Sequence, residues 1–101
     1  MKVEAHFGAI HSHFDNDLII DYYGKSVDVY ALCICDGGEI FDEAYFTSKG
    51  ELFDYADMFG FEVGNCDWNT GLEGHGYIVE DGKIVDSVDF EYDVLYCYAE
   101  A

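Results

Sequence analysis

The segment from Tyr77 to Asp86 reads YIVEDGKIVD and predicts a β-hairpin. Two short runs, Tyr77 to Glu80 and Lys83 to Asp86, flank the dipeptide Asp81-Gly82. A type I′ turn needs positive φ at both central residues, and Asp-Gly supplies such a pair. Strands joined by so tight a turn must be antiparallel. The sheet around this hairpin is therefore expected to be antiparallel.

Further strands are expected on both sides of this hairpin. Gly24-Lys25 marks a turn, and Asp36-Gly37-Gly38 is a second hairpin signal. Residues 62–76 are rich in glycine and asparagine and are expected to form a loop. The expected strands run from Lys2 to Phe7, Asp17 to Tyr23, Val27 to Cys35, Glu39 to Thr47 and Ser87 to Ala99.

A single clear helix is expected near residues 49–59. Ser48 and Glu51 fit a capping box, with Ser48 as N-cap and Glu51 at the third helical position. Gly60 is a natural C-terminal stop. An apolar face at helical spacing is expected to pack on the sheet. Its residues are Leu52, Phe53, Ala56 and Phe59.

These elements predict one α+β domain covering residues 1–101. It would hold an antiparallel β-sheet of about four to six strands with one main α-helix packed on it. The sequence has no proline, no internal repeat and no linker. A length of 101 residues is enough for one compact core.

The charge balance is extreme. Twenty-two Asp and Glu face four scattered Lys and no Arg, which gives a formal net charge of −18. Because 50% of the residues are hydrophobic and 18% are aromatic, the acidic residues are expected to belong to a folded domain and not to a disordered tail. Solubility alone needs roughly 2 to 8 charges in a small domain. Direct binding to nucleic acid or to an anionic membrane is therefore disfavoured, and a basic protein partner is favoured.

Three rows of carboxylates are the candidate partner-binding residues. In the last expected strand, alternation places Asp89, Glu91 and Asp93 on one face at a spacing of about 6.8 Å, similar to successive phosphates along a DNA strand. A solvated outer face of a half-buried sheet would show the same alternation. The other two rows are Glu51, Asp54 and Asp57 on the helix, and Glu39, Asp42 and Glu43 on a strand.

Metal-binding and catalytic patterns are weak. Asp15-Asn16-Asp17 resembles the start of a calcium loop, but Ile20 stands where an EF-hand needs Gly. His11-Ser12-His13 and Cys33-Ile34-Cys35 lack the spacing of a zinc site. No nucleophile elbow, phosphate loop or zinc-protease motif is present, and a Cys66–His75 pair is an unspecific signal. We expect no metal, no cofactor and no catalytic residue.

The four cysteines, at positions 33, 35, 66 and 97, are expected to be reduced. Met1-Lys2-Val3-Glu4 begins no apolar signal segment, and no apolar run approaches the about 20 residues needed to cross a bilayer. A cytoplasmic protein keeps its thiols reduced, so we expect the cysteines to act mostly as small buried hydrophobic residues.

In length, charge, acidic rows, aromatic content and lack of Arg, the chain resembles the small acidic proteins of phages and mobile elements that mimic DNA. That class includes anti-restriction and anti-CRISPR proteins and inhibitors of DNA-repair enzymes. The resemblance implies a non-enzymatic inhibitor, in the cytoplasm of a bacterial host, that occupies the basic nucleic-acid site of a Cas effector or a restriction enzyme. A homodimer is possible. Two alternatives remain open: a halophile-adapted acidic protein, and a small metal-binding or enzymatic domain.

Overall fold

The computed structural model describes residues 1–8 and 12–100 and contains six strands and one helix within them. The elements are β1 (Lys2–His6), β2 (Asp17–Asp21), β3 (Val27–Asp36), β4 (Glu39–Phe46), α1 (Lys49–Met58), β5 (Glu62–Glu80) and β6 (Lys83–Glu100). The first four strands and the helix lie within one or two residues of their expected positions. None of the helices in the described part of the chain is long and apolar enough to span a membrane.

The α+β expectation is wrong. Strands hold 67% of the described residues and form a six-stranded, nearly closed, barrel-like sheet, while the single helix within those residues is ten residues long. The curvature of this sheet lets it enclose most of the core by itself. The helix therefore covers only part of one face and is not a second layer over the whole sheet.

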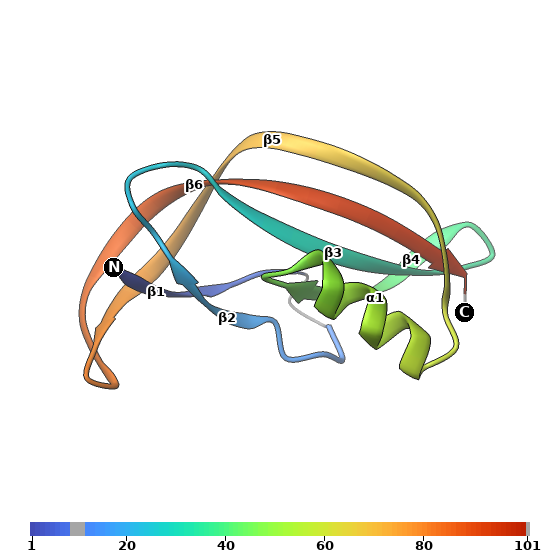
Figure 1. Ribbon diagram of the computed structural model, residues 1–101, viewed down its shortest axis with the longest axis horizontal. Coiled ribbons are helices and arrows are strands. Elements are labelled where there is room, and N and C mark those ends of the chain that lie inside the picture. Colours follow the sequence, from blue (N-terminus) through green and yellow to red (C-terminus); the bar gives the residue numbers. More distant parts are fainter. Residues whose placement is uncertain (9–11, 101) are drawn as a thin grey trace.

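The long β5–β6 hairpin forms the centre of the sheet. The two strands run side by side along the molecule and meet in a tight turn close to the N-terminus, with the C-terminus at the opposite end (Figure 1). Asp81 and Gly82 have φ values of 51° and 76°, which confirms the expected turn with positive φ at both positions. The runs predicted as separate short strands are parts of these two long strands.

Residues 62–76 belong to β5, so their prediction as a loop is wrong. Two of the glycines lie inside the strand because neighbouring groups approach the backbone too closely for a side chain. A Cβ on Gly74 would lie 2.6 Å from the Phe90 ring, and one on Gly76 would lie 2.7 Å from the Glu4 carbonyl oxygen. Gly71, with φ +69°, lies where the register shifts between Asn69 and Leu72. The composition of this segment indicated turns, but its glycines instead permit close packing and β-bulges within the strand.

The strand order is β2-β1-β5-β6-β3-β4, and β3 pairs with β6 in parallel. The expectation that all pairs are antiparallel, with β2 beside β3, is therefore wrong. β2 pairs with β1 instead, and two backbone hydrogen bonds between Met1 and Tyr22 continue that pairing. The connection through Gly24 and Lys25 consequently crosses from one edge of the sheet to β3 and does not close a hairpin.

Two clusters of buried side chains lie on the two faces of the sheet. The interior cluster draws residues from both edges of the sheet, which is the sign of near closure; it includes Val3, Phe7, Ile20, Val29, Tyr45, Phe90 and Val94. The second cluster lies between α1 and the opposite face of β3, β4 and β6, and includes Leu32, Ile34, Ala44, Leu52, Ala56, Leu95 and Cys97. We call these faces the interior face and the helix face.

The helix begins as expected, because the Ser48 hydroxyl accepts a hydrogen bond from the Glu51 backbone N–H at 3.1 Å. Its phase differs from the expected one. Leu52 and Ala56 are buried, as predicted, but Phe53 and Phe59 are 38% and 58% exposed. The narrow seam formed by Leu52 and Ala56 is enough because only a small area of the sheet lies under α1.

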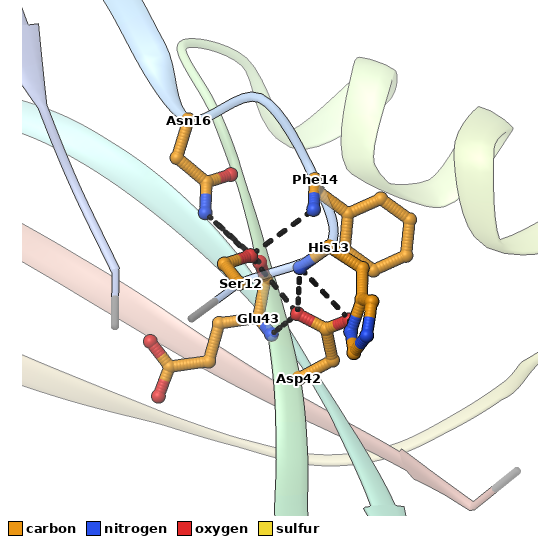
Figure 2. Close-up of polar contacts among 6 residues, drawn as sticks. All are labelled: Ser12, His13, Phe14, Asn16, Asp42 and Glu43. Carbon is orange, nitrogen blue, oxygen red and sulfur yellow. Dashed lines mark hydrogen bonds and ion pairs between the residues drawn. The ribbon is translucent and has the colours of Figure 1, made fainter. Parts of the chain in front are cut away.

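A polar cluster closes the gap between the two edges of the sheet (Figure 2). Asn16 is fully buried just before β2. Its side-chain amide makes the hydrogen bonds to the edge of β4 that a backbone peptide group of a neighbouring strand would make. Its Nδ2 donates to the Glu43 carbonyl oxygen at 3.0 Å, and its Oδ1 accepts from the Tyr45 backbone N–H at 3.1 Å. One side chain thus satisfies two backbone groups of the edge strand β4, which has no neighbouring strand on that side within the described residues.

Candidate partner-binding surface

The predicted row on β6 lies on the helix face of the sheet. Phe90 and Val94 are buried in the interior cluster, while Asp89, Glu91 and Asp93 point to the opposite side. Asp89 has a side chain that is 88% exposed, and Glu91 is also exposed. Asp93 is half-buried and accepts a hydrogen bond from the Gly71 backbone N–H at 2.9 Å, which holds the bulge of β5 in place.

The sheet places two further carboxylates beside this row. Glu73 on β5 lies directly opposite Glu91, and Asp28 on β3 lies directly opposite Asp93. Both added side chains belong to exposed residues. We call this five-residue set the β6 acidic patch; it consists of Asp28, Glu73, Asp89, Glu91 and Asp93.

Opposed like charges recur across the sheet. Besides the two pairs in the patch, Glu62 lies opposite Glu100 and Asp36 lies opposite Glu39. Like charges directly opposite one another destabilise a sheet. Within residues 1–8 and 12–100, the one ion pair between a lysine and a carboxylate joins Lys2 to Asp21 at 2.7 Å. The carboxylates of the patch thus form no ion pair with a lysine among the described residues.

The helical row is a continuation of the same face. Beyond Asp93, β6 continues with Leu95, Cys97 and Ala99, which α1 covers. Glu51, Asp54 and Asp57 are all exposed on the other side of that helix. The helix row and the β6 acidic patch therefore follow one another along one side of the molecule.

The three residues predicted on β4 do not form one surface. Glu39 is exposed at the β3–β4 hairpin. Asp42 lies on the helix face, but its side chain is only 3% exposed. Glu43, one residue later, points to the interior face, where its Oε2 accepts a hydrogen bond from the Tyr45 hydroxyl at 2.9 Å. Asp42 is consequently buried, and the partly exposed Glu43 lies on the other face of the sheet.

Asp42 has a structural environment instead (Figure 2). Its carboxylate accepts hydrogen bonds from the Ser12 hydroxyl at 2.9 Å, from the Glu43 backbone N–H at 2.9 Å and from the backbone N–H of His13. Burial by itself would raise the pKa of Asp42, but these hydrogen bonds and the contact with the His13 ring outweigh it and hold the pKa below its usual value. Asp42 thus anchors the segment that closes the barrel.

The thiols and histidines do not gather into a catalytic group in the described residues. Burial, followed by the charges of Glu43 and Cys35, raises the pKa of Cys33 to about 12, so this thiol stays protonated at neutral pH. Cys66 lies opposite Cys97, with the two Sγ atoms 2.7 Å apart. His75 is nine positions further along the same strand and contacts Asp89, so Cys66 and His75 are not brought together. His11 lies outside the described residues.

Sequence reasoning missed Asp28 and Glu73 because neither belongs to an acidic row in the sequence. Glu73 lies in the segment that was predicted as a loop, and Asp28 joins the patch only through the parallel pairing of β3 with β6. Strand register was the information needed to find them. Comparisons with protein-family models, curated protein sequences and solved structures return no match for this chain.

Proposed function

We propose that this chain is an acidic inhibitor that binds the basic nucleic-acid site of a bacterial defence enzyme, a CRISPR effector or a restriction enzyme, and blocks DNA engagement. One observation carries the proposal: carboxylates lie opposite carboxylates in the β6 acidic patch, with no lysine between them. Because this arrangement costs stability, solvation alone is a poor reason to retain it. Binding to Lys and Arg side chains of a partner would give these opposed carboxylates a function.

A shallow hollow beside the patch supports recognition of arginine. Its volume is about 350 Å³, and one half-buried aromatic residue, Tyr22, lines it together with carboxylates. The lining residues are Tyr22, Gly24, Glu73, Asp89, Phe90 and Glu91, and the ring of Phe90 is buried in the interior cluster. A guanidinium group prefers this combination because it stacks on aromatic faces and donates paired hydrogen bonds to carboxylates. Arginines that hold phosphates in a DNA-binding channel would therefore find both kinds of partner here.

Complementary charge of this kind acts mainly on the rate and specificity of association. The inhibitor would approach a basic channel quickly at low salt, and its affinity would fall as salt screens exposed charges beyond about 8 Å. It would compete with DNA because both ligands need the same Lys and Arg side chains.

A DNA-displacement assay tests the proposal. Purified restriction endonucleases and RNA-guided CRISPR effectors are incubated with labelled target DNA and increasing amounts of the chain. For an enzyme that is inhibited, the double variant Glu73→Lys/Glu91→Lys should raise the inhibitory concentration at least about tenfold, a change of about 1.4 kcal/mol. These two residues are chosen because, unlike Asp89 and Asp93, they accept no hydrogen bond from the described residues that the substitution would remove.

The matched control is Glu62→Lys/Glu100→Lys, which changes the net charge equally at another opposed pair. Glu100 lies nine residues after Glu91 on β6, a separation of about 30 Å along the strand. The control should inhibit almost as well as the natural chain. Equal loss in both double variants would show that net charge alone matters, and no loss in either would refute a role for the patch.

A further inference from the structure

Two histidines and two aspartates form a row across four neighbouring strands. His6 on β1 lies opposite Asp17 on β2, and His75 on β5 lies opposite Asp89 on β6. The pairing of β1 with β5 ends at Ala5 and Gly76, so His6 and His75 are the next residues on each strand. All four residues are exposed, and the row reads Asp17, His6, His75, Asp89 from one edge strand inward.

The two imidazoles share one hollow. Its volume is about 250 Å³, and it is lined by Glu4, His6, Asp17, His75 and Tyr77. The ring of His75 packs edge-on against Tyr77 with centroids 5.7 Å apart, which limits its orientations. The hollow thus brings two imidazoles to one place, with Glu4 in its lining.

Each imidazole is oriented by its aspartate. His6 Nδ1 lies 2.6 Å from Asp17 Oδ1, and His75 Nδ1 lies 2.8 Å from Asp89 Oδ1. An ionised carboxylate only accepts hydrogen bonds, so the proton of each neutral ring belongs on Nδ1 and a lone pair remains on Nε2. Metal-binding histidines commonly have this arrangement, in which a carboxylate fixes the tautomer and raises the basicity of the ligating nitrogen.

We propose that His6 and His75 bind one divalent transition-metal ion, such as Cu²⁺, Ni²⁺ or Zn²⁺, through their Nε2 atoms. Imidazole suits these ions, whereas Mg²⁺ and Ca²⁺ prefer oxygen ligands. Among the residues that the structure describes, no three His, Cys, Asp or Glu side chains converge on one ion position, so water completes the coordination. The formal net charge of −18 adds a general attraction for cations. The site adjoins the surface proposed for a basic partner: His6, His75 and Glu4 lie outside the β6 acidic patch, while Asp89, which orients His75, belongs to it.

His13 supplies a matched control within the same chain. Its Nδ1 lies 2.8 Å from Asp42 Oδ2, so it is also an exposed imidazole beside a carboxylate. If a single imidazole–carboxylate pair were sufficient, His13 would bind metal as well as the row does.

Isothermal titration with CuCl₂ and ZnCl₂ tests the assignment in the full chain. We expect about one ion per chain, binding at least about tenfold weaker in His6→Ala and in His75→Ala, and binding within twofold of the natural chain in His13→Ala. Asp17→Asn should weaken binding by about tenfold through the orientation of His6. The Cu²⁺ electron paramagnetic resonance spectrum should show coupling to two equivalent nitrogens in the natural chain and to one in each single variant.

Three results would overturn the assignment. Binding that survives in the His6→Ala/His75→Ala double variant would place the ion elsewhere. Loss of binding in Cys66→Ser would make a thiol the ligand, and equal binding of MgCl₂ would reduce the effect to attraction by the acidic surface.

Discussion

Asn16 shows how one side chain can decide whether a curved sheet closes. It is fully buried, and its amide makes hydrogen bonds to the Glu43 carbonyl oxygen, the Tyr45 backbone N–H and the Ser12 hydroxyl. Removal of this amide would leave the two backbone groups of β4 without a partner in a region that water does not reach freely, and an unsatisfied buried group costs about 1–3 kcal/mol.

We therefore expect Asn16→Ala to lower the free energy of unfolding by about 2–4 kcal/mol, measured by urea denaturation. Asn65→Ala is the control, because Asn65 is an exposed asparagine of β5 and should stay within about 0.5 kcal/mol of the natural chain. A loss below about 1 kcal/mol for Asn16→Ala would show that the closing hydrogen bonds are dispensable.

Asp42 predicts a pH dependence at the same junction. Because its pKa is lowered in the folded state, its contribution to stability is fully present above the unfolded pKa of about 4 and is lost as the pH falls through the folded pKa. Asp42→Asn should therefore lower the free energy of unfolding by about 2 kcal/mol at pH 7, and the difference from the natural chain should shrink below pH 4.

The control is Asp54→Asn, which removes the same charge at an exposed position of α1. Both variants are unfolded with denaturant at a series of pH values. That control should stay close to the natural chain at pH 7. A deficit of Asp42→Asn that is constant between pH 2 and pH 7 would contradict the charge of Asp42 as the source of its contribution.

At the scale of elements, the helix is held by a narrow seam. Leu52 is fully buried against the sheet, whereas Phe53 is 38% exposed and has the Lys49 ammonium 5.8 Å from the centre of its ring. Leu52→Ala should cost about 2–4 kcal/mol of unfolding free energy, and Phe53→Ala less than about 1 kcal/mol. Equilibrium unfolding of both variants checks the phase, and a larger loss for Phe53→Ala would restore the phase expected from the sequence.

The opposed pair Glu73 and Glu91 makes a prediction that needs no partner. Replacing Glu91 by lysine turns a repulsive cross-strand pair into an attractive one, so Glu91→Lys should raise the free energy of unfolding by about 0.2–1 kcal/mol. The gain should shrink at high salt as the charges are screened. Thermal unfolding at low and high ionic strength measures it; an unchanged or lower stability at low salt would mean that the repulsion has little energetic weight.

Local signals predicted the local parts of this fold. The Asp81-Gly82 turn and the Ser48 cap each depend on residues within a few positions, and both are confirmed. The inclusion of residues 62–76 in β5 depends on contacts of Gly74 and Gly76 with Phe90 and Glu4, which no local pattern contains. For the same reason the row on β6 could be found by alternation, while Asp28, Glu73 and the facing of His6 with His75 depend on strand register.

At the scale of the whole molecule, a curved sheet carries a large excess of negative charge. The molecule measures 42 × 24 × 24 Å, and the long β5–β6 hairpin runs along it (Figure 1). These two strands carry many of the acidic residues. Its net charge of −18 repels nucleic acid and attracts basic surfaces. A nearly closed sheet provides a stiff support on which the carboxylates of the β6 acidic patch keep fixed spacings.

The most direct test is a competition measurement on an enzyme that the chain inhibits. The affinity of the natural chain, of Glu73→Lys/Glu91→Lys and of the control Glu62→Lys/Glu100→Lys is measured at rising salt, with and without saturating target DNA. DNA should exclude the natural chain, and the affinity of the natural chain should fall steeply with salt. Only the patch variant should lose both affinity and most of that salt dependence. Mimicry would be contradicted if DNA and the chain bound the enzyme simultaneously, or if neither salt nor the patch substitutions changed the affinity. The acidic residues would then serve solvation, as in a halophile-adapted protein.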